Sequence, residues 1–199
     1  MALLSVLFSP AGTRRRVWRV IDARLLTSAL LFLVDPGLAS QGVRAPEYQV
    51  KAAFLFNFAQ FVEWPPDAVP DSAAPLVIGT LGDDPFGGIL DATVRDEHLG
   101  ARPFVVRRFA RVEDIRACDI LFISQSEGNR LEPILAGLEN RPILTVSDID
   151  RFAERGGMIG FVTDRHIRLK INLQPAQAAH LTISSKLLRV AEMVTPTGR

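Results

Sequence analysis

The chain has 199 residues, a formal net charge of +1, 48% hydrophobic residues and 23% charged residues. This length suits one domain or two small ones, and the hydrophobic fraction excludes a disordered or collagen-like chain. The near-neutral charge argues against a nucleic-acid-binding module, which normally has a basic face. The single cysteine, Cys118, excludes an internal disulfide framework and a cysteine-rich zinc site.

Residues 1–39 are predicted to be a secretory signal peptide. Five arginines lie between positions 14 and 24, an uncharged stretch follows at 25–34, and Gly37 and Ala39 place small residues at the −3 and −1 positions of a cleavage site. The apolar stretch is short for a membrane-spanning helix, which needs about 20 residues. An uncleaved N-terminal anchor is the alternative. Removing residues 1–39 leaves 18 basic and 20 acidic residues, a net charge of −2.

Residues 47–64 have the pattern of an amphipathic helix that ends before Pro65 and Pro66. Two side chains do not fit this pattern. Lys51 falls within the apolar face, and we favour a lysine that extends its charged end to solvent over a partly buried cation with a carboxylate partner. Phe56 falls among polar residues, either packed under a neighbouring loop or exposed at a partner interface.

The rest of the chain alternates between strand and helix patterns. Strands are expected at 75–81, 104–106, 119–123 and 143–146, and a hairpin with arms at 158–162 and 167–172. Helical segments are expected at 86–94 (with an Asp cap and Pro85 in its first turn), around 112–115, at 131–138, from 147 or 148 to 153, from 175 on, and at 184–194. Cys118 stands at the entry to an apolar run, and we expect it to be a buried core residue.

These repeated strand–helix units predict an α/β fold with three layers. The sheet is mostly parallel, helices cover both of its faces, and a C-terminal antiparallel hairpin closes it at one edge. No linker, repeat or low-complexity run interrupts the pattern, so we interpret residues 46–195 as a single domain.

The usual catalytic and cofactor motifs are missing from the sequence, and we predict no catalytic residue, metal ligand or cofactor. The three histidines lie far apart, and neither a nucleophile elbow nor a P-loop is present. Gly82, Asp83 and Asp84 follow one strand and Ser124 follows another, which makes these four residues a candidate ligand loop. A receiver domain would need an aspartate where Ser124 stands, so that interpretation is rejected. The cluster of Arg107, Arg108 and Arg111 is interpreted as a solvated strand edge.

Several segments together resemble the YfiR-like periplasmic family. They are residues 48–58, 61–65, 77–86, 118–124, 144–148, 156–161, 167–172 and 183–188, and they follow the family's order. The resemblance covers about residues 47–192. It implies a periplasmic regulator rather than an enzyme, of the kind that represses an inner-membrane diguanylate cyclase by contact with its sensor domain. Such repression lowers cyclic-di-GMP signalling and biofilm formation.

The resemblance also implies a partner in the inner membrane, either a diguanylate cyclase or a histidine kinase, and allows a homodimer; nucleic acid is not expected as a partner. The best-known relative has disulfides tied to redox sensitivity, which this chain, with Cys118 alone, cannot form within itself. We expect Phe56, Phe58, Trp64 and Pro65 to contact the partner, because interfaces favour aromatic anchors. For Phe58 a core position is the favoured alternative. The second hypothesis for function is a periplasmic small-ligand binding or sensing protein of a two-component or transport system.

Overall fold

The computed structural model describes residues 37–68 and 73–195. The predicted signal peptide lies outside the described residues, apart from its last three positions. Along the chain the elements are α1 (Gly37–Phe58), β1 (Val62–Glu63), η1 (Pro66–Ala68), β2 (Leu76–Leu81), α2 (Gly88–Val94), β3 (His98–Leu99), β4 (Arg102–Phe109), η2 (Val112–Asp114), β5 (Ile120–Ile123), η3 (Gln125–Arg130), α3 (Leu131–Gly137), β6 (Leu144–Ser147), β7 (Ile159–Thr163), β8 (Ile167–Ile171), α4 (Leu173–Ala178), β9 (Thr182–Ile183), α5 (Ser185–Leu188) and β10 (Glu192–Met193).

The main sheet has eight strands in the order β10-β8-β7-β6-β5-β2-β4-β3. The pairs β4–β2, β2–β5, β5–β6 and β6–β7 are parallel, whereas β7–β8 and β3–β4 are antiparallel. The parallel part therefore follows the doubly wound order in which the first strand lies between the second and the third. This confirms the predicted α/β class with its mostly parallel sheet.

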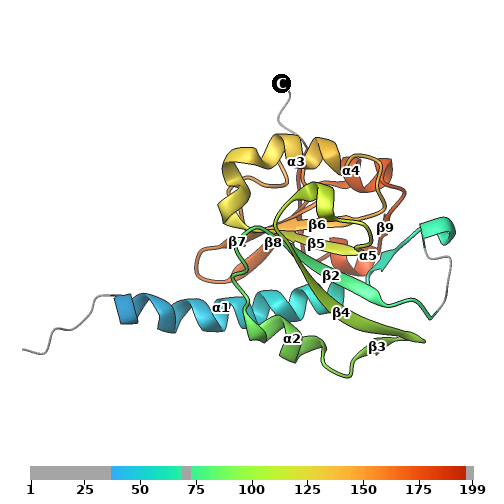
Figure 1. Ribbon diagram of the computed structural model, residues 1–199. Helices are drawn as coiled ribbons and strands as arrows, with labels where there is room; N and C mark the ends of the chain where they lie inside the picture. The colour runs from blue at the N-terminus through green and yellow to red at the C-terminus, as the bar shows by residue number, and fades with distance from the viewer. Residues whose placement is uncertain (1–36, 69–72, 196–199) are drawn as a thin grey trace, which may run out of the picture. The chain divides into compact units, whose positions relative to one another are not determined.

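Helices lie on both faces of the sheet: α1 and α2 on one side and α3 on the other (Figure 1). Alternation along the strands separates the two cores. On β5, Ile120 and Phe122 join the larger hydrophobic cluster on the α1 side, whereas Leu121 and Ile123 join the cluster on the α3 side. Burial of all four β5 residues explains why the segment is a continuous apolar run.

The strand predictions hold better than the helix predictions. β2, β5, β6 and the hairpin β7–β8 lie within two residues of their expected bounds, and β4 is longer than expected. The hairpin does not form the edge of the sheet, because β10 adds a parallel strand outside β8. That strand replaces the end of the helix expected at 184–194, of which only α5 is helical.

Three further helix expectations are wrong in their details. Helix α1 begins at Gly37 and contains Pro46, and it ends at Phe58 because Val62 then pairs with Ile183 of β9. Helix α2 begins at Gly88, without the expected Asp cap. The segment after β6 forms turns, in which Arg151 has a φ of 54°, a left-handed conformation that a helix cannot contain.

Candidate functional site

The most unusual side chain of the protein is Lys51 of α1, which is 1% exposed. Its Nζ lies 2.6 Å from Oδ2 of Asp148, whose side chain is 4% exposed, and 2.5 Å from Oε1 of Glu47. The Tyr48 hydroxyl donates a hydrogen bond of 2.9 Å to the same Asp148 oxygen. This corrects the favoured interpretation of Lys51: its charge is buried and held by carboxylates, because Asp148 reaches it from another element.

Local structure explains why these groups meet. Glu47 and Lys51 are one helical turn apart, so they share a face of α1. Asp148 follows β6 directly, and Ser147 fixes the start of this loop. The Ser147 hydroxyl donates to the Ile123 carbonyl of β5 at 2.6 Å and accepts from the Ile149 amide at 2.9 Å. The network therefore ties α1 to the carboxyl edge of the parallel strands.

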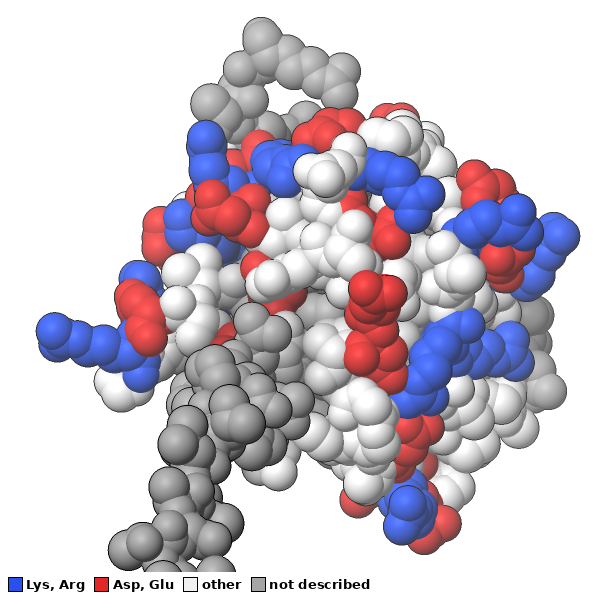
Figure 2. All heavy atoms as spheres, turned by 60° about the vertical axis from the view of Figure 1, so that its left-hand side comes forward, with Lys and Arg blue, Asp and Glu red and all other residues white. Residues whose placement is uncertain are grey.

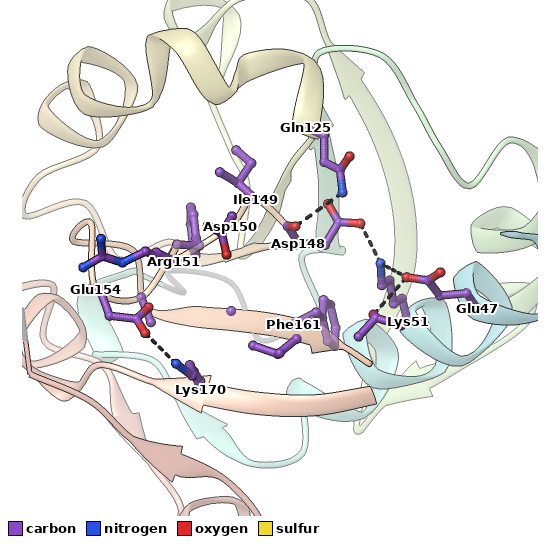
Figure 3. A pocket seen from close by; sticks show the side chains of 15 residues that line it. Glu47, Lys51, Gln125, Asp148, Ile149, Asp150, Arg151, Glu154, Phe161 and Lys170 are labelled. Atoms are coloured by element: carbon purple, nitrogen blue, oxygen red, sulfur yellow. Dashed lines mark hydrogen bonds and ion pairs between the residues drawn. The ribbon is translucent and has the colours of Figure 1, made fainter. Parts of the chain in front are cut away.

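A pocket of about 520 Å³ opens beside this network, bounded by the middle of α1, the loop after β6 and the strands β7 and β8. Figure 3 shows the pair Lys51–Asp148 on one side of the pocket, the pair Glu154–Lys170 on the other, and Phe161 between them. Clefts at the carboxyl ends of the strands are the usual ligand position in doubly wound folds. The volume is in the range of small-molecule sites.

The second ion pair of the pocket changes the acidity of both partners. Lys170 Nζ lies 2.6 Å from Glu154 Oε1. Burial raises the pKa of Glu154, but the hydrogen bond from Lys170, a backbone hydrogen bond and the charges of Lys170 and Arg151 together lower it by more, so this pKa lies below its ordinary value. The same hydrogen bond raises the pKa of Lys170. Both groups are therefore charged around neutral pH.

Two residues that line the pocket each have one carboxylate oxygen without a hydrogen-bond partner among the described residues. These oxygens are Asp148 Oδ1 and Glu154 Oε2, and both are shielded from solvent. Each carboxylate thus satisfies one oxygen with a lysine and leaves the other unsatisfied. Buried polar atoms without a partner are uncommon in proteins, and such atoms call for an explanation.

The structure brings the residues of the predicted ligand loop together, but backbone amides of this loop are already hydrogen-bonded to neighbouring residues of the protein. The Ser124 amide donates to the Leu81 carbonyl at 3.0 Å, which places Ser124 beside Gly82. Gly82 has a φ of 86°, and a Cβ there would lie 2.4 Å from Ser126 Oγ, so only glycine fits. The Asp83 amide donates to Ser126 Oγ at 3.0 Å. The pocket described above shares this edge of the sheet but is lined by other residues.

Asp84 and Arg108 form a second charged cluster at this edge of the sheet. Asp84 accepts from the Phe86 amide at 2.9 Å and from Arg108 Nε at 2.7 Å. Arg108 also lies 2.5 Å from Asp91 of α2, and its hydrogen bond lowers the pKa of Asp91. The arginine cluster is therefore partly neutralised. Figure 2 shows the side of the molecule that is on the left in Figure 1, and acidic and basic side chains are interspersed on this face.

The four residues expected to contact a partner differ in exposure. Phe58 is fully buried in the core, which confirms the favoured alternative for this residue and removes it from the partner-contact set. Phe56 is half-buried, with its ring centroid 5.0 Å from that of Phe104. Trp64 and Pro65 are also half-buried, and the indole N–H of Trp64 has no partner among the described residues. A partner role for Phe56, Trp64 and Pro65 stays a prediction.

Cys118 is half-buried and packs against the hydrophobic cluster on the α3 side, so the predicted core position is confirmed in part. Its thiol donates to the Ile120 carbonyl, with Sγ 3.1 Å from the oxygen. Burial raises the pKa of the thiol to about 12. The folded protein therefore keeps Cys118 protonated and unreactive at neutral pH.

Within the described part of the chain, no group of three or more acidic, histidine or cysteine side chains is arranged to hold a metal ion. None of the helices in this part has the length and apolarity that crossing a bilayer requires.

The comparisons with known proteins decide the family. The model of the YfiR/HmsC-like family (DUF4154) matches residues 48–192. The chain belongs to the YfiR/HmsC-like family. The match includes α1 from Tyr48 onward and ends in β10, so it takes in both sides of the pocket. This confirms the resemblance drawn from the sequence segments.

No curated protein matches the chain. Among solved structures, the chain is similar to a conserved domain protein from Vibrio cholerae O1 biovar El Tor, at 12% identity with a TM-score of 0.45. The similarity covers 65% of this chain and 57% of that protein.

Proposed function

We propose that this protein is an exported regulator that binds the periplasmic sensor domain of an inner-membrane diguanylate cyclase and holds the enzyme inactive. The observation that carries the proposal is the family match over residues 48–192, nearly the whole of the predicted mature chain. The family is consistent with a periplasmic regulator of this kind. The basic and apolar pattern of residues 1–39 supports export to the compartment where such a sensor domain lies.

Half-buried aromatic residues near the end of α1 support a docking face. Phe56 and Trp64 each keep part of a large ring accessible, and Pro65 follows Trp64 directly. Rings of this kind supply contact area at a small cost in side-chain entropy, and they are enriched at the centres of interfaces.

The test of this proposal measures cyclic-di-GMP in the native host. Deletion of the gene raises cyclic-di-GMP, and the full chain restores the low level. A chain that begins at residue 40, without the predicted signal, does not restore it. If deletion leaves cyclic-di-GMP unchanged, or if the version without the signal restores repression, the proposal is wrong.

A matched pair of variants tests the docking face. Phe56→Glu places a charge on a half-buried ring position, and Val50→Glu places the same charge on the same helix at a side chain that is 45% exposed. We expect Phe56→Glu to lose capture of the cyclase and Val50→Glu to keep it. Because Phe56 packs on Phe104, Trp64→Ala provides a second variant, and circular dichroism verifies that each variant is folded. Capture by folded Phe56→Glu and folded Trp64→Ala would show that the docking face lies elsewhere.

The second candidate function is a periplasmic protein that binds or senses a small ligand. The pocket of about 520 Å³ at the carboxyl edge of the sheet is the observation that favours it. An unchanged cyclic-di-GMP level on deletion, together with a metabolite that co-purifies with the exported protein, would select this function over the first.

A further inference from the structure

We propose that the pocket between Lys51–Asp148 and Glu154–Lys170 binds a small organic cation that carries amino or guanidino N–H donors. The inference rests on the pocket alone, so it holds whether or not the protein represses a cyclase.

The first argument is the surplus of hydrogen-bond acceptors. Asp148 and Glu154 each use one oxygen for a lysine, at 2.6 Å in both cases, and each has a second oxygen without a partner among the described residues. A carboxylate can accept about four hydrogen bonds, so both groups have capacity left. A ligand fits here if it donates hydrogen bonds, whereas one that only accepts them would leave both oxygens unsatisfied.

The second argument is charge. The ionisable residues that line the pocket are four acids and three bases: Glu47, Asp148, Asp150 and Glu154 against Lys51, Arg151 and Lys170. The pocket therefore carries a formal charge of −1 when all seven groups are ionised. Burial of the Asp148 side chain, which is 4% exposed, strengthens the attraction for a cation because water screens the charge less there.

The third argument is the arrangement of the two acids. Asp148 and Glu154 lie on opposite sides of the pocket, with Phe161 between them (Figure 3). A ligand with donor groups at two points and carbon between them can meet both acids and cover the ring. Both unpaired oxygens are shielded from solvent in the structure, so binding requires each carboxylate to rotate about its terminal torsion, which is soft in Asp and Glu.

The position of the pocket gives binding a consequence for the rest of the protein. Asp148 holds Lys51 and Tyr48 of α1, and Thr163 at the end of β7 donates to Glu47 at 3.0 Å. A cation bound at Asp148 therefore acts on the contacts that fasten α1 to the sheet. The same helix bears Phe56, one of the predicted docking residues.

The experiment is titration calorimetry of the purified chain from residue 40 with putrescine, agmatine and arginine. Tetramethylammonium is the control cation without N–H donors, and glutarate is the control anion. We expect saturable binding of at least one of the three donors and none of either control. Equal binding of tetramethylammonium, or binding of none of the three donors, would overturn the proposal.

Variants of the two acids test whether the cation binds in this pocket. Glu154→Gln removes the acceptor charge on one side of the pocket and should weaken binding about tenfold or more, the effect typical of a charged hydrogen bond. Glu97→Gln, an exposed glutamate beyond α2, is the matched control and should bind like the wild type. Asp148→Asn tests the other side, with circular dichroism as the check of folding. Unchanged affinity in Glu154→Gln would remove the pocket as the binding site.

Discussion

Two charged clusters each connect a helix to the carboxyl edge of the sheet, but they differ in burial. Lys51–Asp148 joins α1 to the end of β6, and Asp91–Arg108 joins α2 to the end of β4. Lys51 and Asp148 have side chains that are 1% and 4% exposed, whereas Arg108 and Asp91 are 40% and 45% exposed.

Burial changes what each cluster does for the fold. When one partner of a buried ion pair is removed, water does not reach the remaining charge, which stays buried without compensation. The two charges are therefore needed together, and we call such a pair an obligate unit. An exposed charge that loses its partner is simply hydrated, and the pair adds little stability. The two clusters make similar connections but should contribute differently to the free energy of unfolding, and mutations in each cluster measure this difference.

The largest effect is expected for Asp148→Ala. The substitution leaves Lys51 buried next to Glu47 alone and removes the acceptor of the Tyr48 hydroxyl. We expect a loss of about 3–5 kcal/mol in the free energy of unfolding, measured by urea denaturation near neutral pH. Asp150→Ala, an exposed aspartate of the same loop, is the control and should change the stability by about 0.5 kcal/mol or less. A loss below about 1 kcal/mol in Asp148→Ala would show that the buried pair is not an obligate unit.

The double variant Lys51→Met with Asp148→Asn sharpens this result. It removes both charges, and the asparagine oxygen still accepts from Tyr48. The charge that remains is that of Glu47, which is 26% exposed and keeps its hydrogen bond from Thr163. We therefore expect a loss of about 1–2 kcal/mol, smaller than that of Asp148→Ala alone. The measurement is the same urea titration. A double variant less stable than Asp148→Ala would mean that the pair stabilises the fold by more than it costs to desolvate.

An intermediate effect is expected for Glu154→Gln, since Glu154 is 14% exposed and paired with Lys170. The folded pKa of Glu154 lies below the ordinary value of 4.5, so its charge stabilises the fold above that pH, and this contribution is lost as the pH falls. We expect a loss of about 1 kcal/mol in the variant near neutral pH, fading below about pH 4. The check is the difference in unfolding free energy between wild type and variant across this pH range. A difference that does not depend on pH would exclude the charged pair as its source.

The longer strands of the main sheet could be predicted from the sequence because their signal is local, whereas the two-residue strands β1, β3, β9 and β10 were not predicted. Ile120–Ile123 and Leu144–Ser147 are short runs that are buried on both faces, and such runs are recognisable without knowledge of their neighbours. The hairpin was also predicted, because alternation and a polar turn mark it.

The partner of Lys51 could not be predicted, since Asp148 is 97 residues away in the sequence. A lysine in the apolar arc of a helix was the available signal, and snorkelling accounts for it equally well when no carboxylate is known to be near. The early end of α1 has the same kind of cause, because pairing of Val62 with Ile183 replaces another helical turn. Contacts between distant segments decided both outcomes.

The smallest effect is expected for Arg108→Ala at the exposed cluster. Arg108 contacts Asp84, Asp91 and the Gly87 carbonyl. When Arg108 is removed, Asp91 is readily hydrated, and Asp84, which is 16% exposed, keeps its hydrogen bond from the Phe86 amide. We expect a loss of about 1 kcal/mol or less in unfolding free energy, decreasing further at high salt. The hydrogen bond from Arg108 lowers the pKa of Asp91, so this pKa should rise toward 3.8 in the variant, as followed by NMR titration of the carboxylates. A loss as large as that of Asp148→Ala would mean that the connection between α2 and the sheet depends on Arg108 and that exposure does not set the energetic difference between the two clusters.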